Sequence, residues 1–154
     1  MKKCAYEQGN HPRWMRVFLS CLLIVGFSAS ARAESLGGQL YKGYVGDKSI
    51  TLYLKTEDAC GLGPASSGMY RYDGKSEWLE LEITRSDSQF AMVEDGFTGL
   101  LMVTRDGKQL NGMWISPDRK RQLPVRLLEA PLSKEDVAMY QNRLEKLNYG
   151  NHDC

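Results

Sequence analysis

Apolar and polar side chains alternate along the chain from residue 39 to residue 129. Four sets of apolar residues each share one face of their segment: Ile50, Leu52 and Leu54; Leu79, Leu81 and Ile83; Phe97, Leu101 and Val103; Leu123, Val125 and Leu127. A period of two is that of a β-strand with one buried face, so Glu80 and Glu82, which alternate with the second set, are expected in solvent. Strands that each bury one side are typical of an antiparallel sheet wrapped around its own core.

Turn sequences separate these segments at regular intervals. They are Gly46-Asp47-Lys48, Asp73-Gly74-Lys75, Asp95-Gly96, Asp106-Gly107-Lys108 and Ser116-Pro117-Asp118, and they supply the positive or preset φ of tight turns. The pattern predicts strands at residues 39–45, 49–55, 67–73, 77–84, 89–94, 97–104, 108–115 and 121–128. Eight strands in a meander close an up-and-down barrel, whose interior holds side chains or one small ligand. Because proline lacks a backbone donor, Pro124 predicts an edge or a bulge in the last strand.

The period changes after Pro131. Ser133 and Asp136 form a capping box, and apolar residues follow at helical spacing: Val137, Tyr140, Leu144 and Leu147. We expect one amphipathic C-terminal helix of about fourteen residues, whose apolar stripe closes a barrel end or the sheet edge. Tyr53 and Trp78 are out of phase with the leucines of their strands. They are expected on the outer face, as part of a binding surface or packed under this helix.

The first 33 residues follow a different order, with basic residues first and then an apolar run over residues 17–27, followed by the small-x-small site Ala31-Arg32-Ala33. This order is typical of a secretory signal peptide cleaved before Glu34. The run is shorter than the roughly 20 residues of a membrane-spanning helix. We therefore expect a periplasmic or secreted protein of the Gram-negative export type without membrane insertion, and one barrel domain over residues 34–154. An uncleaved anchor is the alternative, and Met15 is a candidate initiator.

Removal of residues 1–33 changes the charge and the cysteine count. It takes away five basic residues and one acidic residue, which leaves 15 basic and 18 acidic residues and a net charge near −3. Such a chain offers no electrostatic basis for binding nucleic acid. Cys4 and Cys21 leave with the signal, and Cys60 and Cys154 remain in an oxidising compartment. We predict a disulfide between these two, with a reactive thiol pair or a metal site as the alternative.

The sequence presents no recognisable catalytic device. General acid, base or nucleophilic catalysis needs titratable groups gathered in a pocket, and the expected mature chain has one histidine, His152, near its C-terminus. Carboxylate pairs occur at Glu57 with Asp58, Glu80 with Glu82, and Glu94 with Asp95. They flank turns or face out of the sheet, where charges are normally solvated. No metal-ligand spacing is present, and we expect a protein that is not an enzyme and holds no cofactor or metal.

Two segments are candidate binding surfaces. The longest irregular segment, residues 56–67, would place Leu62 and Pro64 on a loop anchored by Cys60, and long loops in a tight meander often carry binding function. A connection that only carries the disulfide is the alternative. The second candidate is the basic turn Arg119-Lys120-Arg121, which suits an acidic partner or an anionic envelope polymer, or else is a solvated hairpin tip.

A series of hairpin motifs runs through most of the expected mature chain: Tyr41-Lys42-Gly43, Ile50-Thr51-Leu52-Tyr53-Leu54, Gly68-Met69-Tyr70, Leu79-Glu80-Leu81, Leu110-Asn111-Gly112-Met113-Trp114, Pro117-Asp118 and Leu123-Pro124-Val125. This series resembles that of small exported bacterial β-meander proteins of unknown function. The resemblance implies a fold and an exported location only.

A second resemblance rests on Ser67-Gly68-Met69-Tyr70-Arg71-Tyr72. This stretch is similar to the Ser-Gly-x-Arg-Tyr motif of periplasmic C-type lysozyme inhibitors, which are eight-stranded barrels whose serine enters the lysozyme cleft. Here an extra residue separates glycine from arginine, and the expected cysteine pair does not match that family's first-strand cysteine. The resemblance implies that Ser67, Arg71 and Tyr72 contact a partner.

These features favour a non-catalytic periplasmic binding protein that recognises an envelope protein through the 56–67 loop and neighbouring hairpin tips. Inhibition of a cell-wall hydrolase such as lysozyme is the most specific form of this hypothesis. The alternative is a lipocalin-like carrier that holds a small-molecule ligand in the barrel interior. Leucine, isoleucine, valine and phenylalanine dominate the expected inward positions, which favours a filled core and the first hypothesis. An envelope enzyme is a third, weaker hypothesis, and the oligomeric state stays open.

Overall fold

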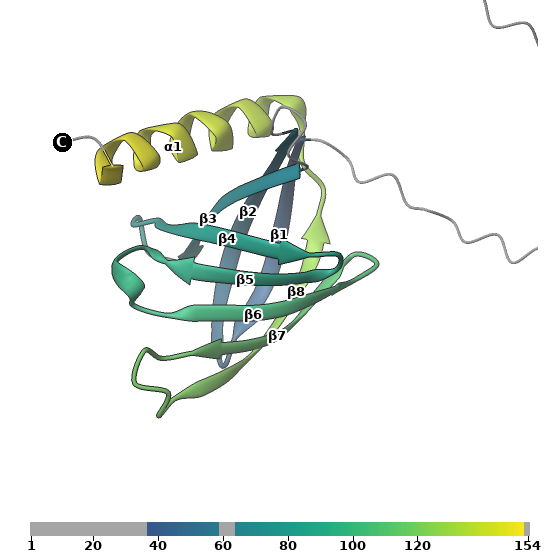
Figure 1. Cartoon of the computed structure of the whole chain (residues 1–154). Coiled ribbons are helices and arrows are strands. Elements are labelled where there is room, and N and C mark those ends of the chain that lie inside the picture. Colours follow the sequence, from purple (N-terminus) through teal and green to yellow (C-terminus); the bar gives the residue numbers. More distant parts are fainter. Residues whose placement is uncertain (1–36, 59–63, 153–154) are drawn as a thin grey trace, which may run out of the picture. The chain divides into compact units, whose positions relative to one another are not determined.

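Eight antiparallel strands close into a barrel in the order in which they follow one another along the chain (Figure 1). The computed structural model describes residues 37–58 and 64–152. The strands are β1 (Gly37–Val45), β2 (Lys48–Asp58), β3 (Pro64–Tyr72), β4 (Leu79–Ser86), β5 (Gln89–Glu94), β6 (Leu100–Asp106), β7 (Gln109–Ile115) and β8 (Gln122–Ala130). A short 3₁₀ helix, η1 (Asp95–Phe97), lies between β5 and β6, and the C-terminal helix is α1 (Lys134–His152). The predicted mainly-β meander with one C-terminal helix is confirmed.

The barrel closes because β1 pairs with both β2 and β8. As a whole, β8 is not an edge strand, because it has neighbours on both sides. Its register with β7 runs through Pro124 without a bulge, and Pro124 itself lies one residue beyond the register with β1. The Pro124 carbonyl accepts the backbone N–H of Gly46 at 2.8 Å, so the Pro124 nitrogen also points toward the β1 side. Pairing of β8 with β1 runs only to Val125, opposite Val45, and the missing proline donor therefore removes no bond from the ladder with β7.

Large side chains fill the barrel interior, as the alternating pattern predicted. The buried residues of this core come from all eight strands: Tyr41, Val45, Ile50, Leu52, Leu54, Tyr70, Leu81, Phe90, Met92, Leu101, Val103, Leu110, Trp114, Val125 and Leu127. Close approach between strands accompanies this packing. A Cβ atom at Gly43 would collide with the backbone carbonyl of Arg126, and one at Gly112 with that of Met102, so glycine at these two positions permits the strands to coil tightly.

The capping box predicted at the start of the helix is confirmed. The backbone N–H of Asp136 donates to Ser133 Oγ at 3.0 Å, and Ser133 Oγ donates to Asp136 Oδ2 at 2.9 Å. The helix is 19 residues long rather than about fourteen. Within the described residues, no helix has the length and apolar character needed to cross a membrane.

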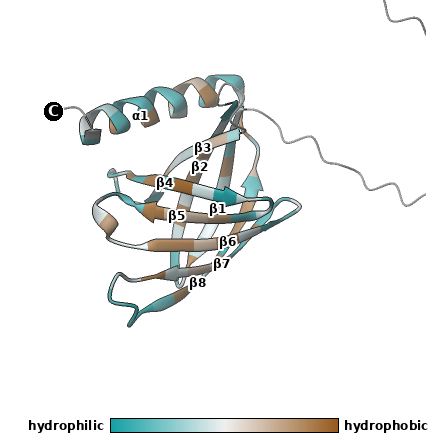
Figure 2. Cartoon of the chain, in the orientation of Figure 1, coloured by the Kyte–Doolittle hydropathy of each residue, from teal (hydrophilic) through white to brown (hydrophobic). Residues whose placement is uncertain are grey.

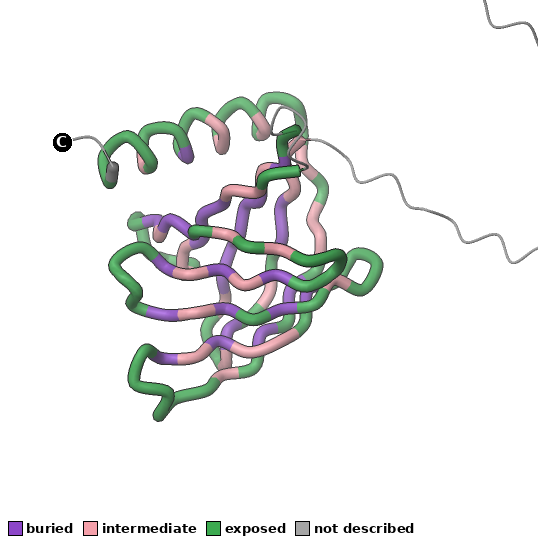
Figure 3. Tube along the Cα trace, viewed as in Figure 1, coloured by how far each residue is buried: buried purple, intermediate pink, exposed green. Residues whose placement is uncertain are grey.

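The helix lies on the outer face of the barrel, so the prediction that it closes a barrel end or a sheet edge is wrong. Leu144 packs in a second apolar cluster with Trp78 of the β3–β4 connection and with three outward-facing side chains of the barrel strands: Leu40, Tyr53 and Met69. The ring of Tyr140 stacks on Tyr53 with centroids 5.1 Å apart and meets Trp78 edge-on at 5.7 Å. Figures 2 and 3 show mixed hydropathy along a mostly exposed α1, and among its described side chains Leu144 alone is buried.

The predicted loop over residues 56–67 is mostly strand, so this prediction is wrong. Thr56 pairs with Ser66, Glu57 with Ala65, and Asp58 with Pro64 at the end of the β2–β3 ladder. Only residues 59–63 remain between the two strands, and they lie outside the described residues. The glycines, proline and small polar residues of this segment suggested a long loop, but strand pairing with β2 outweighs their low intrinsic preference for extended structure.

Candidate functional site

A buried carboxylate connects three separate elements at one end of the barrel. Glu94, the last residue of β5, is 3% exposed. Its Oε1 atom accepts the Tyr70 hydroxyl at 2.5 Å and the Trp114 indole Nε1–H at 2.6 Å, and its Oε2 atom accepts the Thr98 hydroxyl at 2.7 Å. Tyr70 belongs to β3, Trp114 to β7, and Thr98 to the connection after η1. We call these four side chains the Glu94 network.

The prediction that Glu94 is a solvated charge beside a turn is wrong. Phe90, Met92 and Glu94 are buried at alternating positions of β5, so the period that places phenylalanine and methionine inside also carries the carboxylate inward. This alternation was the signal available in the sequence. Burial, and then the hydrogen bond to the Glu94 carboxylate, raise the pKa of Tyr70 far above its ordinary value. Tyr70 therefore keeps its proton and acts as a donor.

The connection between β5 and β6 presents an exposed aromatic side chain. Phe97 is 57% exposed and has a φ of 54°, so the prediction that it points inward with Leu101 is wrong. A positive φ is unusual for a bulky residue. The Glu94 network fixes the segment that carries Phe97, because Thr98 donates to the carboxylate and the Glu94 backbone N–H donates to the Gly99 carbonyl at 2.9 Å.

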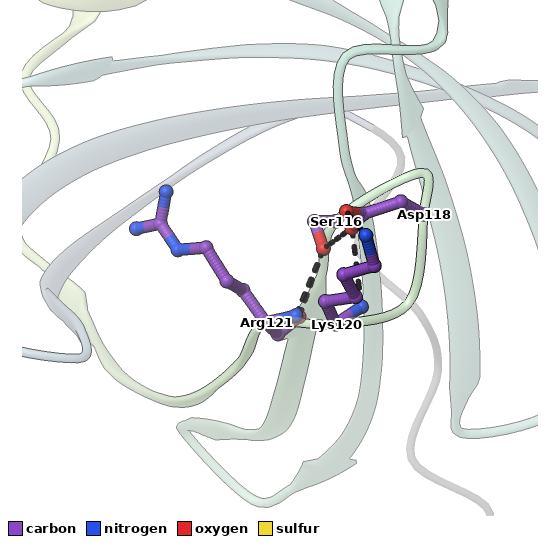
Figure 4. Close-up of polar contacts among 4 residues, drawn as sticks. All are labelled: Ser116, Asp118, Lys120 and Arg121. Carbon is purple, nitrogen blue, oxygen red and sulfur yellow. Dashed lines mark hydrogen bonds and ion pairs between the residues drawn. The ribbon is translucent and has the colours of Figure 1, made fainter.

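The basic turn between β7 and β8 is held by its own hydrogen bonds (Figure 4). Ser116 Oγ donates to Asp118 Oδ1 at 2.6 Å and accepts the Arg121 backbone N–H at 3.0 Å, and the Lys120 backbone N–H donates to Asp118 Oδ1 at 3.1 Å. The Ser116 hydroxyl, and next the Lys120 backbone N–H, lower the pKa of Asp118. Arg119 has a φ of 59°. These bonds hold the backbone that carries three exposed cationic residues, and the ammonium group of Lys120 lies 3.8 Å from Asp118 Oδ2.

Trp114 is the link between the two connections. Its indole nitrogen donates to Glu94, and the Arg121 guanidinium lies 5.8 Å from its ring centroid. Gly99 lies next to the two atoms that form this hydrogen bond. A Cβ atom at residue 99 would clash with Trp114 Nε1 and with Glu94 Oε1. Figure 1 shows the β5–β6 and β7–β8 connections at the same end of the barrel. We call the exposed side chains of Phe97, Arg119, Lys120 and Arg121 the barrel-end surface.

The residues implied by the lysozyme-inhibitor resemblance do not share one face. Ser67 and Arg71 belong to the outward set of β3, whereas Tyr72 packs on the inner cluster. The Arg71 guanidinium lies 5.0 Å from the centroid of Trp78. Tyr72 meets Tyr70 edge-on at 5.6 Å and so adjoins the Glu94 network.

The other predicted contact residues lie at opposite ends of the barrel or outside the described structure. Pro64 is exposed at the start of β3, opposite Asp58. In a meander, connections after even-numbered strands lie at the end opposite those after odd-numbered strands, so Pro64 is remote from the basic turn. Leu62 and the predicted disulfide of Cys60 with Cys154 lie outside the described residues.

A second carboxylate predicted in solvent is also buried. Glu80 on β4 is 8% exposed, and it accepts the side-chain amides of Asn148 at 2.8 Å and Asn151 at 2.6 Å. The alternating pattern correctly placed Glu80 on the outer face. Only the tertiary structure places α1 over it, because a helix 68 residues further along the chain has no local signature at β4.

Among the described residues, no three His, Cys, Asp or Glu side chains gather closely enough to hold a metal ion. Comparison with protein-family models, with curated proteins and with solved structures finds no match.

Proposed function

We propose that the protein is an exported, non-catalytic binding protein that recognises a protein partner of the cell envelope through the barrel-end surface. The observation that carries this proposal is the side chain of Phe97, which is 57% exposed at a φ of 54°. A non-glycine residue in this conformation costs on the order of 1–3 kcal/mol. Exposure of the ring to water does not offset that cost, whereas burial of the ring in an apolar pocket of a partner would.

The composition and rigidity of the surface support the same proposal. Aromatic side chains and arginine are enriched at the energetic centres of protein interfaces. The Glu94 network fixes the aromatic tip, and Ser116 and Asp118 fix the basic turn. A surface ordered before binding loses less conformational entropy when it meets its partner. The three adjacent cations favour a partner that presents carboxylates around an apolar pocket.

The alternative small-ligand carrier has less support. A carrier needs space inside the barrel, and here Tyr41, Tyr70 and Met92 occupy the interior with no solvent exposure. A catalytic role for Glu94 has little support as well, because both of its oxygens already accept hydrogen bonds from protein donors. The accessible groups are the exposed side chains of the barrel-end surface, which can bind a partner without a cavity or a free carboxylate.

The direct test is affinity capture of envelope proteins by the mature chain, followed by measurement of the affinity of each captured protein. Phe97→Ser and the double variant Arg119→Glu/Arg121→Glu should each lower the affinity for a genuine partner by about tenfold or more. Tyr149→Ser is the matched control, because Tyr149 is an exposed aromatic residue of α1, at 70% exposure. Equal binding by wild type, both surface variants and the control would contradict the proposal.

Inhibition of a cell-wall hydrolase is the finer form of the proposal, and a lysozyme assay tests it separately. The mature protein should inhibit hydrolysis of cell-wall substrate by a C-type lysozyme. Loss of inhibition in Ser67→Asp and Arg71→Glu, but not in Phe97→Ser, would assign the contact to the outer face of β3. The reverse result would assign it to the barrel-end surface. No inhibition by the wild type would remove lysozyme as the partner.

A further inference from the structure

A long cleft runs between α1 and the barrel, next to the β5–β6 connection. Its volume is about 680 Å³, within the range of pockets that bind drug-sized ligands. One wall is a single face of α1: Met139, Asn142, Arg143, Lys146, Leu147 and Asn151. The other comes from the β3–β4 connection, the start of β4 and the β5–β6 connection: Ser76, Glu77, Trp78, Leu79, Glu80, Asp95 and Thr98. We call this space the α1 cleft.

The shape of the α1 cleft fits a linear ligand. Its helical wall extends from Met139 to Asn151, which is about 18 Å at the rise of an α-helix. An extended polypeptide advances about 3.3 Å per residue, so five or six residues of a peptide would span the wall. A compact metabolite would fill only part of it.

The charges of the two walls are opposite in sign. Arg143 and Lys146 lie on the helical wall, and Glu77 and Asp95 lie on the other, all four of them exposed. Within the described part of the chain, no ion pair crosses the cleft between these cations and these carboxylates. The Arg143 guanidinium lies 6.0 Å from the ring centroid of Trp78, at the apolar floor formed with Leu79 and Leu147. A ligand that carries charges of both signs would match the two walls at once.

We propose that the α1 cleft binds an extended peptide segment that carries both acidic and basic side chains. Its acidic side chains face Arg143 and Lys146 on the helical wall, and its basic side chains face Glu77 and Asp95. Its backbone amides suit the neutral polar groups of Ser76 and Asn142, which supply both donors and acceptors, and the Thr98 oxygen, which can accept a further hydrogen bond. A neutral glycan would leave all four charges unmatched, and charge complementarity therefore favours a peptide.

Peptide binding in the α1 cleft goes beyond the proposed use of the barrel-end surface and does not depend on it. The two sites are neighbours, because Asp95 of the cleft wall immediately precedes the tip that carries Phe97. Phe97 itself does not line the cleft. Substitution of Phe97 therefore separates the two proposals.

The test selects ligands from a displayed library of random heptapeptides on the full mature protein. Peptides enriched on the wild type should contain both acidic and basic residues. Their affinity should fall by about tenfold or more on Arg143→Glu/Lys146→Glu. The matched control is Lys134→Glu/Lys108→Glu, which reverses two exposed cations outside the cleft and should bind like the wild type. Amide and indole NMR shifts on titration with an enriched peptide should centre on Trp78 and on Asn142 of α1.

The proposal fails if no peptide is enriched, if the cleft variant and the control bind peptide equally, or if the NMR shifts are confined to other surfaces. Titration with an N-acetylglucosamine hexasaccharide forms a parallel arm, and shifts at Trp78 with the sugar but not with peptides would assign the cleft to glycans instead. Phe97→Ser should leave peptide affinity unchanged. If that variant abolishes peptide binding, the peptides occupy the barrel-end surface and the cleft proposal fails.

Discussion

Trp114 donates its indole N–H to the buried Oε1 atom of Glu94 at 2.6 Å, and this bond joins β7 to β5 at one end of the barrel. The two residues also contact the connections that carry Phe97 and Arg121. Glu94 anchors the segment that carries Phe97 through Thr98, and the Trp114 ring lies under the guanidinium of Arg121. The stability of the barrel and the geometry of the barrel-end surface therefore depend on the same contact.

Replacement of Glu94 by alanine should destabilise the protein by about 3 kcal/mol, because it leaves the buried donors of Tyr70 and Trp114 without an acceptor. Glu94→Gln keeps an oxygen acceptor of the same shape and should cost about 1 kcal/mol. Urea unfolding at neutral pH measures both. Glu82→Ala, at an exposed position of β4, is the control and should lie within about 0.5 kcal/mol of the wild type. A Glu94→Ala variant as stable as that control would show that the network contributes no stability.

Gly99→Ala should destabilise the protein by about 2 kcal/mol, because a methyl group at this position clashes with Trp114 Nε1 and Glu94 Oε1. Gly150→Ala is the paired control. Gly150 lies in α1, and a methyl group added there would meet open space, so alanine should stabilise the helix by a few tenths of a kcal/mol to about 1 kcal/mol. The unfolding temperature should fall below that of the wild type in Gly99→Ala and rise above it in Gly150→Ala. Similar shifts for both would refute the steric role of Gly99.

Phe97→Gly should raise the free energy of unfolding by about 1 kcal/mol, because glycine adopts the φ of 54° without steric cost. The ring is 57% exposed, so little apolar burial is lost. The same substitution should weaken partner binding. A variant that is both less stable and fully able to bind would show that the conformation of Phe97 serves the fold and not recognition.

Stability should fall as the pH rises above about 10, the ordinary pKa of a tyrosine. Burial raises the pKa values of Tyr70 and Tyr53 in the folded protein, so the unfolded chain releases these protons at a lower pH than the folded chain does. Folding is thus favoured below the unfolded pKa, and this contribution is lost as the pH increases. Tyr70→Phe should flatten the alkaline slope in urea unfolding. An unchanged slope in that variant would contradict the buried, protonated state of Tyr70.

The disulfide between Cys60 and Cys154 stays a prediction. Mass spectrometry of the exported protein, digested without reductant, should recover the two cysteines in one linked peptide pair. In the chain-entropy relation, a bond that closes the loop from residue 60 to residue 154 stabilises the fold by about 4 kcal/mol. Reduction should therefore lower the urea concentration at the unfolding midpoint. Free thiols in the exported protein would rule the bond out.

Much of the fold could be predicted because its signals are local. The face shared by Ile50, Leu52 and Leu54 depends on a period of two, and the capping box at Ser133 depends on a spacing of three residues. If the alternation of β6 is continued backward over η1, it predicts that Phe97 faces the barrel interior. The pattern fails at this residue, because Phe97 is exposed. The positive φ of Phe97 depends on the anchoring of the neighbouring Thr98 by Glu94, a contact that no periodicity reports.

Local patterns in the sequence predict the mainly-β class, the eight-strand meander, the inward sets apart from Phe97 and the existence of the C-terminal helix, because hydrophobic alternation and turn chemistry act between residues close in the chain. The burial of Glu80, the hydrogen-bond partners of Glu94, the position of α1 on the outer face and the position of Trp114 between Phe97 and the basic turn follow from the tertiary structure alone. Those features depend on which distant segments meet. Desolvation and hydrogen bonding act on the neighbours that closure of the barrel brings together.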